Sequence, residues 1–198
     1  MNEPIDRIDR LNNSQRSEII DVLANAFRNY PLFPPDPTGR KSHLMVVALL
    51  DAFASAPDAT LFGLSRRGEL ACVAFVFADG YESEGLPLVL FLWRMLRAIG
   101  LQNFLTMARV MSEKRSGDEK RLELMLLGTH SDYQGQGLGR MMLRHVVSFA
   151  REQDYGSVVL ETAKQTPAFS FYLSEGFEVE KEISLPTMPL CMMRQSLD

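Results

Sequence analysis

Hydrophobic residues in the N-terminal half of the chain first recur at helical spacing and then follow strand patterns. In residues 15–29, apolar side chains return every three or four positions, which predicts a helix capped by the polar residues before it. A second helix is expected over residues 41–56 and ends at Pro57. Residues 30–39 between these helices contain four prolines, which remove amide donors, so a loop is expected there. Strands are expected at residues 5–9, 59–66 and 69–78, the last two joined by a hairpin turn around Gly68.

The C-terminal half contains a strand, a glycine-rich turn, a helix and a second strand in close succession. The strands are residues 122–129 and 157–162, and the helix between them is residues 138–153. A helix that crosses from one strand to the next makes the two strands parallel, so we expect an α/β or α+β domain with a mixed sheet. Residues 88–112 show an unusually apolar helical pattern that is interrupted at Gly100. The chain closes with an expected short helix at 166–176 and strands at 177–184 and 190–195.

Length and composition favour one well-buried core. The chain has 198 residues, of which 46% are hydrophobic, so residues 1–198 are expected to form a single domain. The net charge of −4 and the pI near 5.5 argue against a nucleic-acid partner, which normally meets a basic face. A small molecule or a protein is therefore the expected partner.

The cysteines and the apolar stretches indicate in which cellular compartment the protein is expected. Cys72 and Cys191 lie far apart, each in an apolar run, which predicts two buried thiols in a reducing compartment and no metal site. The first ten residues carry acidic side chains and no apolar stretch of the kind found in signal peptides. The longest apolar stretch, residues 86–93, is far shorter than a membrane span. We therefore expect a cytoplasmic protein that has no membrane segment.

The turn before the helix at 138–153 has the sequence SDYQGQGLGRMM and contains three glycines. The first amides of a helix are unpaired and lie at the positive end of its dipole, so Gly135, Gly137 and Gly139 would let a phosphate approach the backbone. A dinucleotide fingerprint requires a glycine at its sixth place, where this chain has Arg140. A nucleoside triphosphate loop ends in Gly-Lys-Ser/Thr, which this turn lacks. A third interpretation is that the glycines only allow the strand and helix to pack closely.

Two motifs resemble those of the Gcn5-related N-acetyltransferases (GNAT). The stretch QGQGLG at residues 134–139 has the family's Gln-x-x-Gly-x-Gly form. The stretch QTPAFSFYLSEGF resembles the family's second motif, in the same order and separation, at Ala168, Tyr172, Gly176 and Phe177. The resemblance implies a mixed, mostly antiparallel sheet with a central parallel strand pair, flanked by helices. It also implies acetyl-CoA as the acyl donor, a binding core at about residues 121–180 and a helical insertion at about residues 86–116.

The resemblance assigns roles to individual residues. It places the pantetheine arm along the backbone of Leu127, Gly128 and Thr129. Tyr172 would lie beside the thioester sulfur. Gln165 stands where the family often has asparagine, and its longer amide is expected to reach the cofactor. The pyrophosphate would rest on the turn formed by Gln134, Gly135, Gln136, Gly137, Leu138, Gly139 and Arg140.

Acetyl transfer to an amine requires a base. A primary amine with a pKa of about 10 is mostly protonated at neutral pH, so a base must take its proton directly or through water. Glu123 is the expected base, because it precedes Gln134 by the same offset as the general-base glutamate of the family's histone acetyltransferases. In an alternating strand its side chain should point away from Leu122, Leu124 and Leu126.

The reaction also requires an acid and a partner for the carbonyl oxygen. The phenol of Tyr172 is expected to donate a proton to the departing thiolate. A backbone amide around Gly128 or Thr129 would meet the carbonyl oxygen. Glu161 is the reserve candidate for the base, and water is a third.

Several other reactive side chains fit structural roles better. His130 follows the strand and could relay a proton, although a loop histidine is more often simply solvated. His145 falls on the apolar stripe of its helix and is expected to pack there. Met192 and Met193, beside Cys191, are expected to be strand core and not a metal or redox site. The apolar stripe of the helix at 138–153, on which His145 falls, consists of Leu138, Met141, Met142 and Phe149.

These observations favour an enzyme, an acetyl-CoA-dependent N-acetyltransferase that acts on an amine of a small molecule or a peptide. An alternative of another class is a sensor or interaction protein that binds acyl-CoA and has lost the chemistry. The binding site for the acceptor is expected to be shaped by residues 29–37, residues 81–116 and the C-terminal strands.

Residues 88–111 lack a clean polar face, which leaves two interpretations. The segment packs as ordinary core, or one side of it lines the acceptor cleft or a contact between the subunits of a homodimer. The second interpretation favours an acceptor with an apolar or anionic part over a simple polyamine. Arg94, Arg97 and Arg109 would lie at the margin of that side, whose apolar members are Phe91, Trp93, Leu96 and Phe104.

Overall fold

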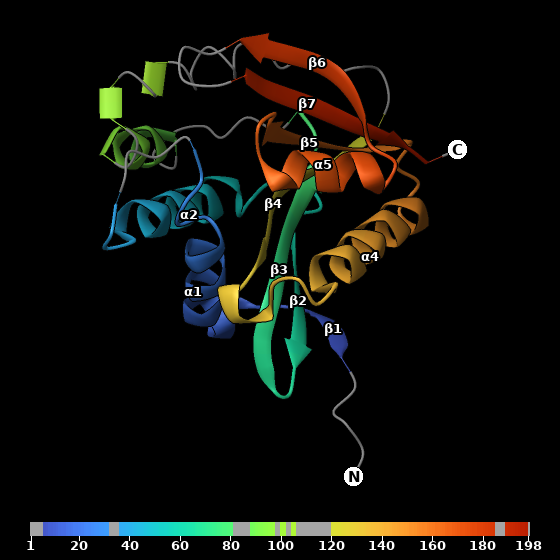
Figure 1. The fold of residues 1–198 in the computed structure, drawn as a ribbon, viewed down its shortest axis with the longest axis horizontal. Coiled ribbons are helices and arrows are strands. Elements are labelled where there is room, and N and C mark those ends of the chain that lie inside the picture. Colours follow the sequence, from blue (N-terminus) through green and yellow to red (C-terminus); the bar gives the residue numbers. More distant parts are fainter. Residues whose placement is uncertain are drawn as a thin grey trace.

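A seven-stranded sheet runs through the centre of the computed structural model, which describes residues 6–31, 36–80, 88–97, 100–101, 104–105, 120–184 and 189–197 (Figure 1). Its strands are β1 (Arg7–Arg10), β2 (Thr60–Arg66), β3 (Glu69–Ala78), β4 (Arg121–Thr129), β5 (Ser157–Ala163), β6 (Glu178–Ser184) and β7 (Pro189–Ser196). They lie in the order β1-β2-β3-β4-β5-β7-β6. β4 and β5 are parallel and the other neighbouring pairs are antiparallel, which confirms the expected mixed sheet.

Helices cover both faces of this sheet. They are α1 (Arg16–Ala26), α2 (Arg40–Phe53), α4 (Leu138–Glu152) and α5 (Pro167–Ser174), with short 3-10 turns η1 (Asn13–Gln15) and η2 (Ser131–Tyr133). α1, α2 and the helical residues 88–97 pack on one face, and α4 and α5 pack on the other (Figure 1). Of the helices that the structure describes, none is long and apolar enough to cross a lipid bilayer.

The first two helices end earlier than predicted. α1 stops at Ala26 and α2 at Phe53. Pro31 and Pro57 follow about one turn later, and a proline disfavours helical backbone in the residue before it. The predicted helix over residues 88–112 is described only at 88–97, 100–101 and 104–105, where it is helical, and its remainder lies outside the described residues.

β3 is buried on both faces and shows the expected two-residue period. Cys72, Ala74 and Val76 pack against α4, whereas Val73, Phe75 and Phe77 pack on the side of α1 and α2. The turn before it has positive φ at Arg67 (55°) and Gly68 (85°), as a two-residue turn of type I′ requires. The hairpin predicted around Gly68 is confirmed.

The parallel strands β4 and β5 separate after three paired positions. Arg121, Leu122 and Glu123 pair with Ser157, Val158 and Val159. Beyond that point, β4 continues to Thr129 along β3, and β5 continues to Ala163 along β7. The described strands therefore diverge from Glu123 onward, and they open a gap in the middle of the sheet.

A β-bulge changes the alternation of β4. Phe75 pairs with Leu126 and Val76 pairs with Leu124, so Met125 is an extra residue on the β4 side. As a result Leu124 faces α4, but Leu126 lies in the cluster formed with α1 and α2. The prediction that Leu126 shares a face with Leu122 and Leu124 is wrong, because strand alternation was assumed to be unbroken.

The two cysteines are buried thiols, as predicted, since Cys72 and Cys191 are both free and enclosed in the core. Met193 packs with Cys191 in the core on the α4 face, and Met192 is partly buried. In the described part of the chain, no group of three His, Cys, Asp or Glu side chains could hold a metal ion.

Candidate active site

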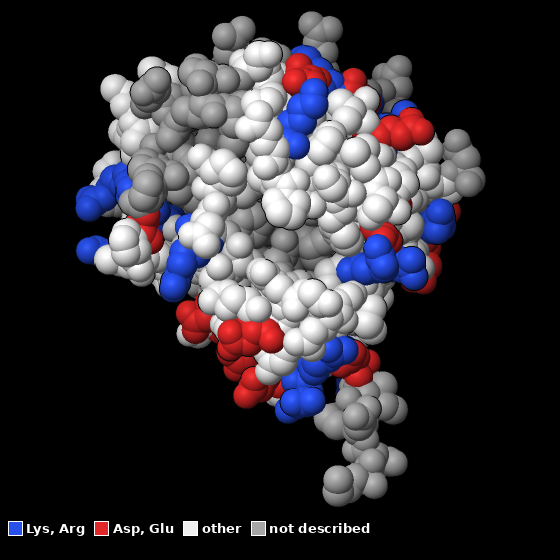
Figure 2. Space-filling model, viewed as in Figure 1, with Lys and Arg blue, Asp and Glu red and all other residues white. Residues whose placement is uncertain are grey.

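A cavity of about 880 Å³ occupies the gap between β4 and β5. Its walls come from β4 and β5, from α1 and α2, from the start of α4 and from α5. Figure 2 shows a hollow in the middle of this face, with mostly uncharged atoms around it and charged side chains farther out. The opening in the sheet therefore gives access to backbone and side chains that a closed sheet would bury.

The glycine turn forms one end of this cavity. Gly135 and Gly137 have positive φ, 75° and 80°, and Gly137 is the N-cap of α4. A Cβ atom at either position would have no neighbour within 4 Å, so packing does not require glycine there. The backbone conformation requires it, and the first residues of α4, 138–140, line the cavity. This geometry fits an anionic group such as a pyrophosphate at the turn.

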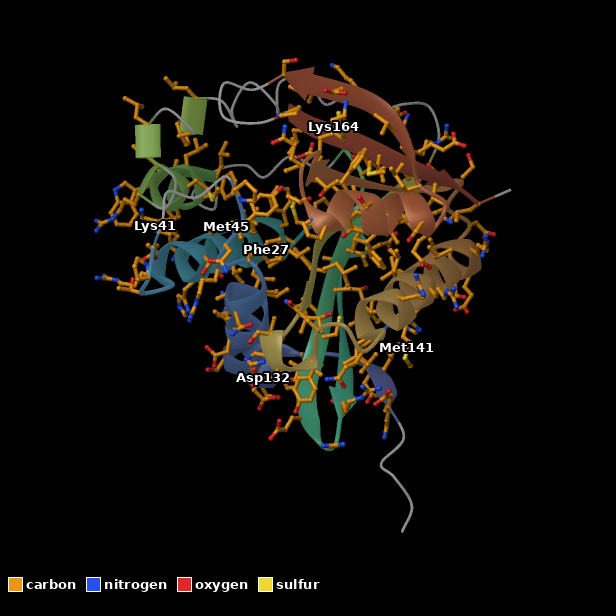
Figure 3. All side chains as sticks on the ribbon, viewed as in Figure 1. Phe27, Lys41, Met45, Asp132, Met141 and Lys164 are labelled. Atoms are coloured by element: carbon orange, nitrogen blue, oxygen red, sulfur yellow. The ribbon has the colours of Figure 1, made fainter. Side chains whose placement is uncertain are left out.

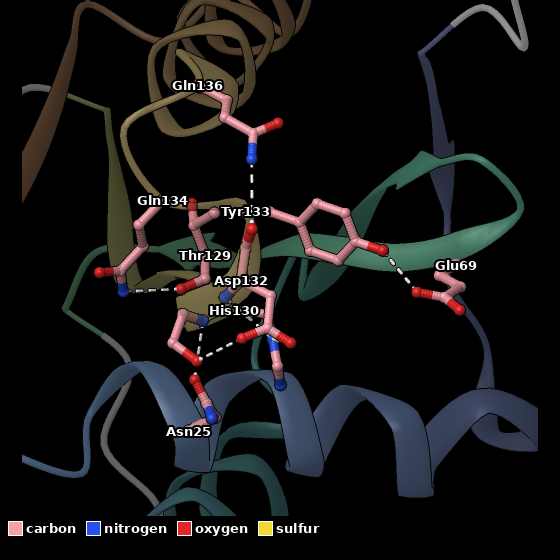
Figure 4. Close-up of polar contacts among 9 residues, drawn as sticks. Asn25, Glu69, Thr129, His130, Asp132, Tyr133, Gln134 and Gln136 are labelled. Carbon is pink, nitrogen blue, oxygen red and sulfur yellow. Dashed lines mark hydrogen bonds and ion pairs between the residues drawn. The ribbon is translucent and has the colours of Figure 1, made fainter.

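Hydrogen bonds hold the turn in place from two sides (Figure 4). The Ser131 amide donates to Oδ1 of Asn25 on α1 at 2.8 Å. The Tyr133 hydroxyl donates to the Glu69 carboxylate at the start of β3. The turn is therefore fixed to α1 and to the β2–β3 hairpin before any ligand binds.

The two glutamine side chains of the turn form hydrogen bonds with protein groups in and beside the turn. Gln134 donates to the Thr129 carbonyl at 3.0 Å, which closes the end of β4 (Figure 4). Gln136 donates to the Asp132 carbonyl at 3.2 Å and accepts from Arg66 Nη1 at 2.6 Å. Gln134 lines the cavity but Gln136 does not, so a side-chain role for Gln136 at a pyrophosphate has no support in the geometry.

The last residues of β4 form the wall next to the turn. Leu127, Gly128 and Thr129 all line the cavity. A Cβ atom on Gly128 would lie 2.9 Å from Cβ of Ala26, so this glycine lets α1 pack closely against β4. Thr129 Oγ1 donates to the Cys72 thiol at 3.3 Å, and burial raises the pKa of Cys72 to about 11.

The two candidate bases lie at the apex of the opening. Glu123 belongs to the last β4–β5 pair, is only 6% exposed and lines the cavity. Glu161 lines the same cavity from β5. A fully exposed position for Glu123 is therefore excluded, and both residues belong to the wall of the cavity.

Two phenols face the same space. Burial raises the pKa of Tyr172 well above its usual range, and nearby Tyr30 and Cys72 contribute in the same direction. Burial also raises the pKa of Tyr30 to about 12, helped by the charge of Glu161 and opposed by the Ala163 amide. Both phenols therefore keep their protons at neutral pH.

Tyr30 was not identified from the sequence as a site residue. It lies in the stretch 29–37, which was expected to shape the acceptor side, and its neighbour Phe27 also lines the cavity. In Figure 3 the side chains of Phe27 and Met45 lie close to one another between α1 and α2. The only sequence signal was the position of the proline-rich loop after α1.

Gln165, predicted as a site residue, and three other side chains considered from the sequence lie outside this cavity. Gln165 is exposed on the turn between β5 and α5 and is absent from the described cavity lining. His130 accepts a hydrogen bond from the Asp132 amide at 3.4 Å and faces a separate polar hollow beside α2. His145 packs edge-on against Phe62, with ring centroids 4.7 Å apart, as expected for a packing histidine. Met141 is 41% exposed on the outside of α4 (Figure 3) and does not belong to the buried stripe.

Residues 88–97 contribute to the cavity through Met95. Phe91 is 3% exposed and packs in the core, and Phe104 is partly buried against the same cluster. Trp93 and Leu96 are exposed and do not line the cavity. The interpretation that Phe91, Trp93, Leu96 and Phe104 line the acceptor cleft is therefore wrong, because the helix turns Met95 inward instead. Arg94 pairs with Asp51, Arg97 covers the Trp93 ring, and Arg109 lies outside the described residues.

The fold and this cavity define an α/β protein with a ligand site at the opening of a mixed sheet. A family model described as "Acetyltransferase (GNAT) family" matches residues 28–177. The chain belongs to the GNAT acetyltransferase family.

Individual relatives and structures agree with this assignment. Human N-acetyltransferase 8B is 43% identical over 61 residues, which are 30% of this chain and only 27% of that protein. The fold resembles a Corynebacterium glutamicum structure described as histone acetyltransferase HPA2 and related acetyltransferase (TM-score 0.69, 21% identity, 96% of both chains). It also resembles PaiA N-acetyltransferase from Thermoplasma acidophilum in complex with coenzyme A (TM-score 0.61, 12% identity, 98% of this chain and 99% of that chain).

Proposed function

We propose that this protein transfers the acetyl group of acetyl-CoA to an amine of a small molecule or a peptide, by direct attack of the amine. The observation that carries the proposal is the cavity between β4 and β5. It has the glycine turn at one end and Glu123 and Tyr172 in its walls. Membership of the acetyltransferase family supports the same reaction type.

The donor would bind at the glycine turn and along β4. The open space before Gly135 and Gly137 suits the pyrophosphate, and Arg140 lines the cavity beside it with a positive charge. Leu127, Gly128 and Thr129 have no β5 partner in the described sheet, so their backbone on that side is available to the pantetheine arm, apart from the Thr129 carbonyl, which accepts from Gln134. Bound acetyl-CoA would supply the acetyl group as a thioester.

Glu123 and Tyr172 would move the protons. The amine nitrogen forms a bond to the carbonyl carbon and loses a proton to Glu123, directly or through water. The carbon–sulfur bond breaks, the sulfur takes the proton of the Tyr172 phenol, and passage of the proton held by Glu123 through water to the phenolate restores both groups. Because burial raises the pKa of Tyr172, the phenol is protonated before the reaction and can donate a hydrogen bond to the departing sulfur. Glu161 is the reserve base.

A direct test follows the two products. The protein is incubated with acetyl-CoA and a mixture of amines, while free thiol is measured and acetylated amines are identified by mass spectrometry. The proposal predicts thiol release that depends on an amine. Binding of acetyl-CoA without any release of CoA would instead identify a non-catalytic acyl-CoA-binding protein of the same fold.

A further inference from the structure

We propose that a polar hollow between α1 and the start of α2, named the α2 hollow below, binds the phosphate group of a small molecule. This hollow has a volume of about 560 Å³. Among the described residues, Asn25 alone lines both the α2 hollow and the cavity between β4 and β5. The site is therefore a second anion site, and it does not depend on the proposed acetyl transfer.

Two helix faces form facing walls of the α2 hollow. On α1, Asp21, Asn25 and Arg28 line it at spacings of four and three residues, so they lie on one side of the helix. On α2, Arg40 and His43 are three residues apart and line it from the first turn. The fold thus brings basic side chains from two helices to one concave space.

The guanidinium groups of Arg28 and Arg40 have no hydrogen-bond or ion-pair partner within the described part of the chain. A Cβ atom on Gly39 would lie 3.3 Å from Nε and from Nη2 of Arg28, so this guanidinium lies against the N-cap residue of α2. The first turn of α2 contains no acidic residue. Asp36 accepts from the Lys41 amide at 2.8 Å but does not line the hollow. Positive charge beside the positive end of a helix is unfavourable, and a bound anion would offset it.

Two histidines add donors to the same space. Nδ1 of His130 accepts a hydrogen bond from the Asp132 amide at 3.4 Å, so the neutral imidazole carries its proton on Nε2. His130 and His43 both line the hollow, where a ring N–H can donate to a ligand oxygen. A phosphate group has three terminal oxygens and up to two negative charges, whereas a carboxylate has two oxygens and one charge. Two guanidinium groups and two imidazoles therefore suit a phosphate better than a carboxylate.

Asp21 places one carboxylate in the lining of the hollow. With the histidines neutral, two arginines and one aspartate give this lining a net charge of +1. Asp21 precedes Arg28 by seven residues, which is about 10 Å along α1 at a rise of 1.5 Å per residue. Its carboxylate can accept a hydrogen bond from a hydroxyl group of a ligand whose phosphate lies at the arginines. The volume also exceeds the needs of a bare phosphate ion, so both features favour a phosphate monoester with a hydroxylated body.

Two hydrogen bonds connect the α2 hollow with the glycine turn (Figure 4). Asn25 accepts from the Ser131 amide at 2.8 Å, and His130 accepts from the Asp132 amide. A ligand that accepts from Nε2 of His130 favours the tautomer that makes the second of these bonds. Phosphate in the hollow should therefore stabilise the turn, and phosphate and CoA should each bind more tightly in the presence of the other.

Calorimetry tests the site without any enzyme assay. Inorganic phosphate, glycerol phosphate and acetate are titrated at one ionic strength, first into the protein alone and then into the protein saturated with CoA, which occupies the glycine turn. Both phosphates should bind in both titrations, about 5-fold more tightly with CoA present, and acetate should not bind. Tighter binding of glycerol phosphate identifies a monoester as the ligand, and tighter binding of inorganic phosphate identifies the free ion.

Three results would contradict parts of this inference. Loss of phosphate binding in the CoA-saturated protein would place the phosphate at the glycine turn and overturn the α2 hollow as a site. Equal phosphate affinity with and without CoA would overturn the connection to the turn and leave the site. Acetate binding as tight as phosphate binding would overturn the selection of phosphate. If CoA itself does not bind, the proposed donor site fails, and the titrations into the protein alone still test the hollow.

Variants assign the binding to the two arginines. Arg28→Gln and Arg40→Gln each remove a charged donor and should weaken phosphate binding by about 10-fold or more. Because neither guanidinium has a described partner, thermal unfolding should show parent-like stability. Arg151→Gln is the matched control, since Arg151 is exposed on α4 and does not line the hollow. Unchanged affinity in Arg28→Gln and Arg40→Gln, or equal losses in all three variants, would overturn the site.

Discussion

Arg140 and Glu175 form an ion pair that joins the two family motifs. Nε of Arg140, in the first turn of α4, lies 2.5 Å from Oε1 of Glu175, the C-cap residue directly after α5. The Glu175 side chain is only 8% exposed and also pairs with Arg144 at 3.4 Å. The second motif therefore orients an arginine that lines the donor end of the cavity.

This pairing predicts different results for the two arginines. Arg140→Ala should weaken acetyl-CoA binding by about 10-fold or more, because a hydrogen bond between charged groups contributes about 1.5–3 kcal/mol. Arg144→Ala removes a partner of the same Glu175 but does not touch the cavity, so calorimetry should find its affinity unchanged. Equal losses in both variants would show that α4 packing, and not a phosphate contact, sets the affinity.

The glycine turn gives a second prediction. Gly137→Glu places a negative side chain in the open space before α4 and should weaken acetyl-CoA binding strongly. The change also strains the backbone, since φ is 80° at this position. Gly68→Glu imposes a similar strain at φ 85°, in a hairpin turn where no neighbour is within 4 Å. Both variants should lose comparable stability, and only Gly137→Glu should lose affinity in calorimetry. Retained affinity in a folded Gly137→Glu variant would contradict a pyrophosphate site at this turn.

Much of the fold could be predicted, because the spacing of apolar residues reports burial directly. β3 alternates between two clusters, and Arg67–Gly68 has the geometry of a tight hairpin turn. The bulge at Met125 could not be predicted, since residues 122–127 are apolar at all positions but one and either register buries leucines. The position of Leu126 is decided by α1 and α2, which lie far away in the sequence.

The candidate site was predicted where a local motif encodes it. Gly137 and Tyr172 stand in short motifs whose backbone geometry is local, and both line the cavity. Tyr30 and Met95 come from segments with no motif, and only tertiary packing brings them to the cavity. Gln136 stands in the motif but does not line the cavity, because its side chain forms hydrogen bonds with Arg66 and with the Asp132 carbonyl.

Tyr172→Phe is predicted to slow turnover by about 100-fold while acetyl-CoA affinity stays unchanged. The phenol pKa is raised by burial, so the acid remains protonated up to at least pH 10, and its loss should lower kcat evenly across neutral pH. Tyr155→Phe is the control, because Tyr155 is also buried but donates to Asp58 and does not line the cavity. That variant should lose stability and keep its kcat. Parent-like kcat in Tyr172→Phe would assign the proton to water or to the backbone.

Glu123→Gln is predicted to remove the acidic limb of the pH dependence of kcat/KM. A carboxylate acts as a base only when it is ionised, so in the parent kcat/KM should fall as the pH is lowered and the group becomes protonated. The amide cannot titrate, and the variant should show a lower kcat/KM without that limb. Glu161→Gln is the comparison, since Glu161 lines the same cavity from β5. If the limb persists in Glu123→Gln and disappears in Glu161→Gln, the base is Glu161.

The helical residues 88–97 present one buried and one exposed aromatic side chain, and these should behave differently. Phe91 is 3% exposed and meets Phe53 edge-on at 6.1 Å, so Phe91→Ala should reduce the free energy of unfolding by about 3–5 kcal/mol. Trp93 is 55% exposed and covered on one side by the Arg97 guanidinium at 4.8 Å, so Trp93→Ala should cost less than about 1 kcal/mol.

Because neither residue lines the cavity, the acceptor KM of Trp93→Ala should equal that of the parent, and a raised KM would restore the cleft interpretation. Light scattering on Trp93→Ala tests the remaining alternative, since a drop in mass would show that this exposed face joins two copies of the chain.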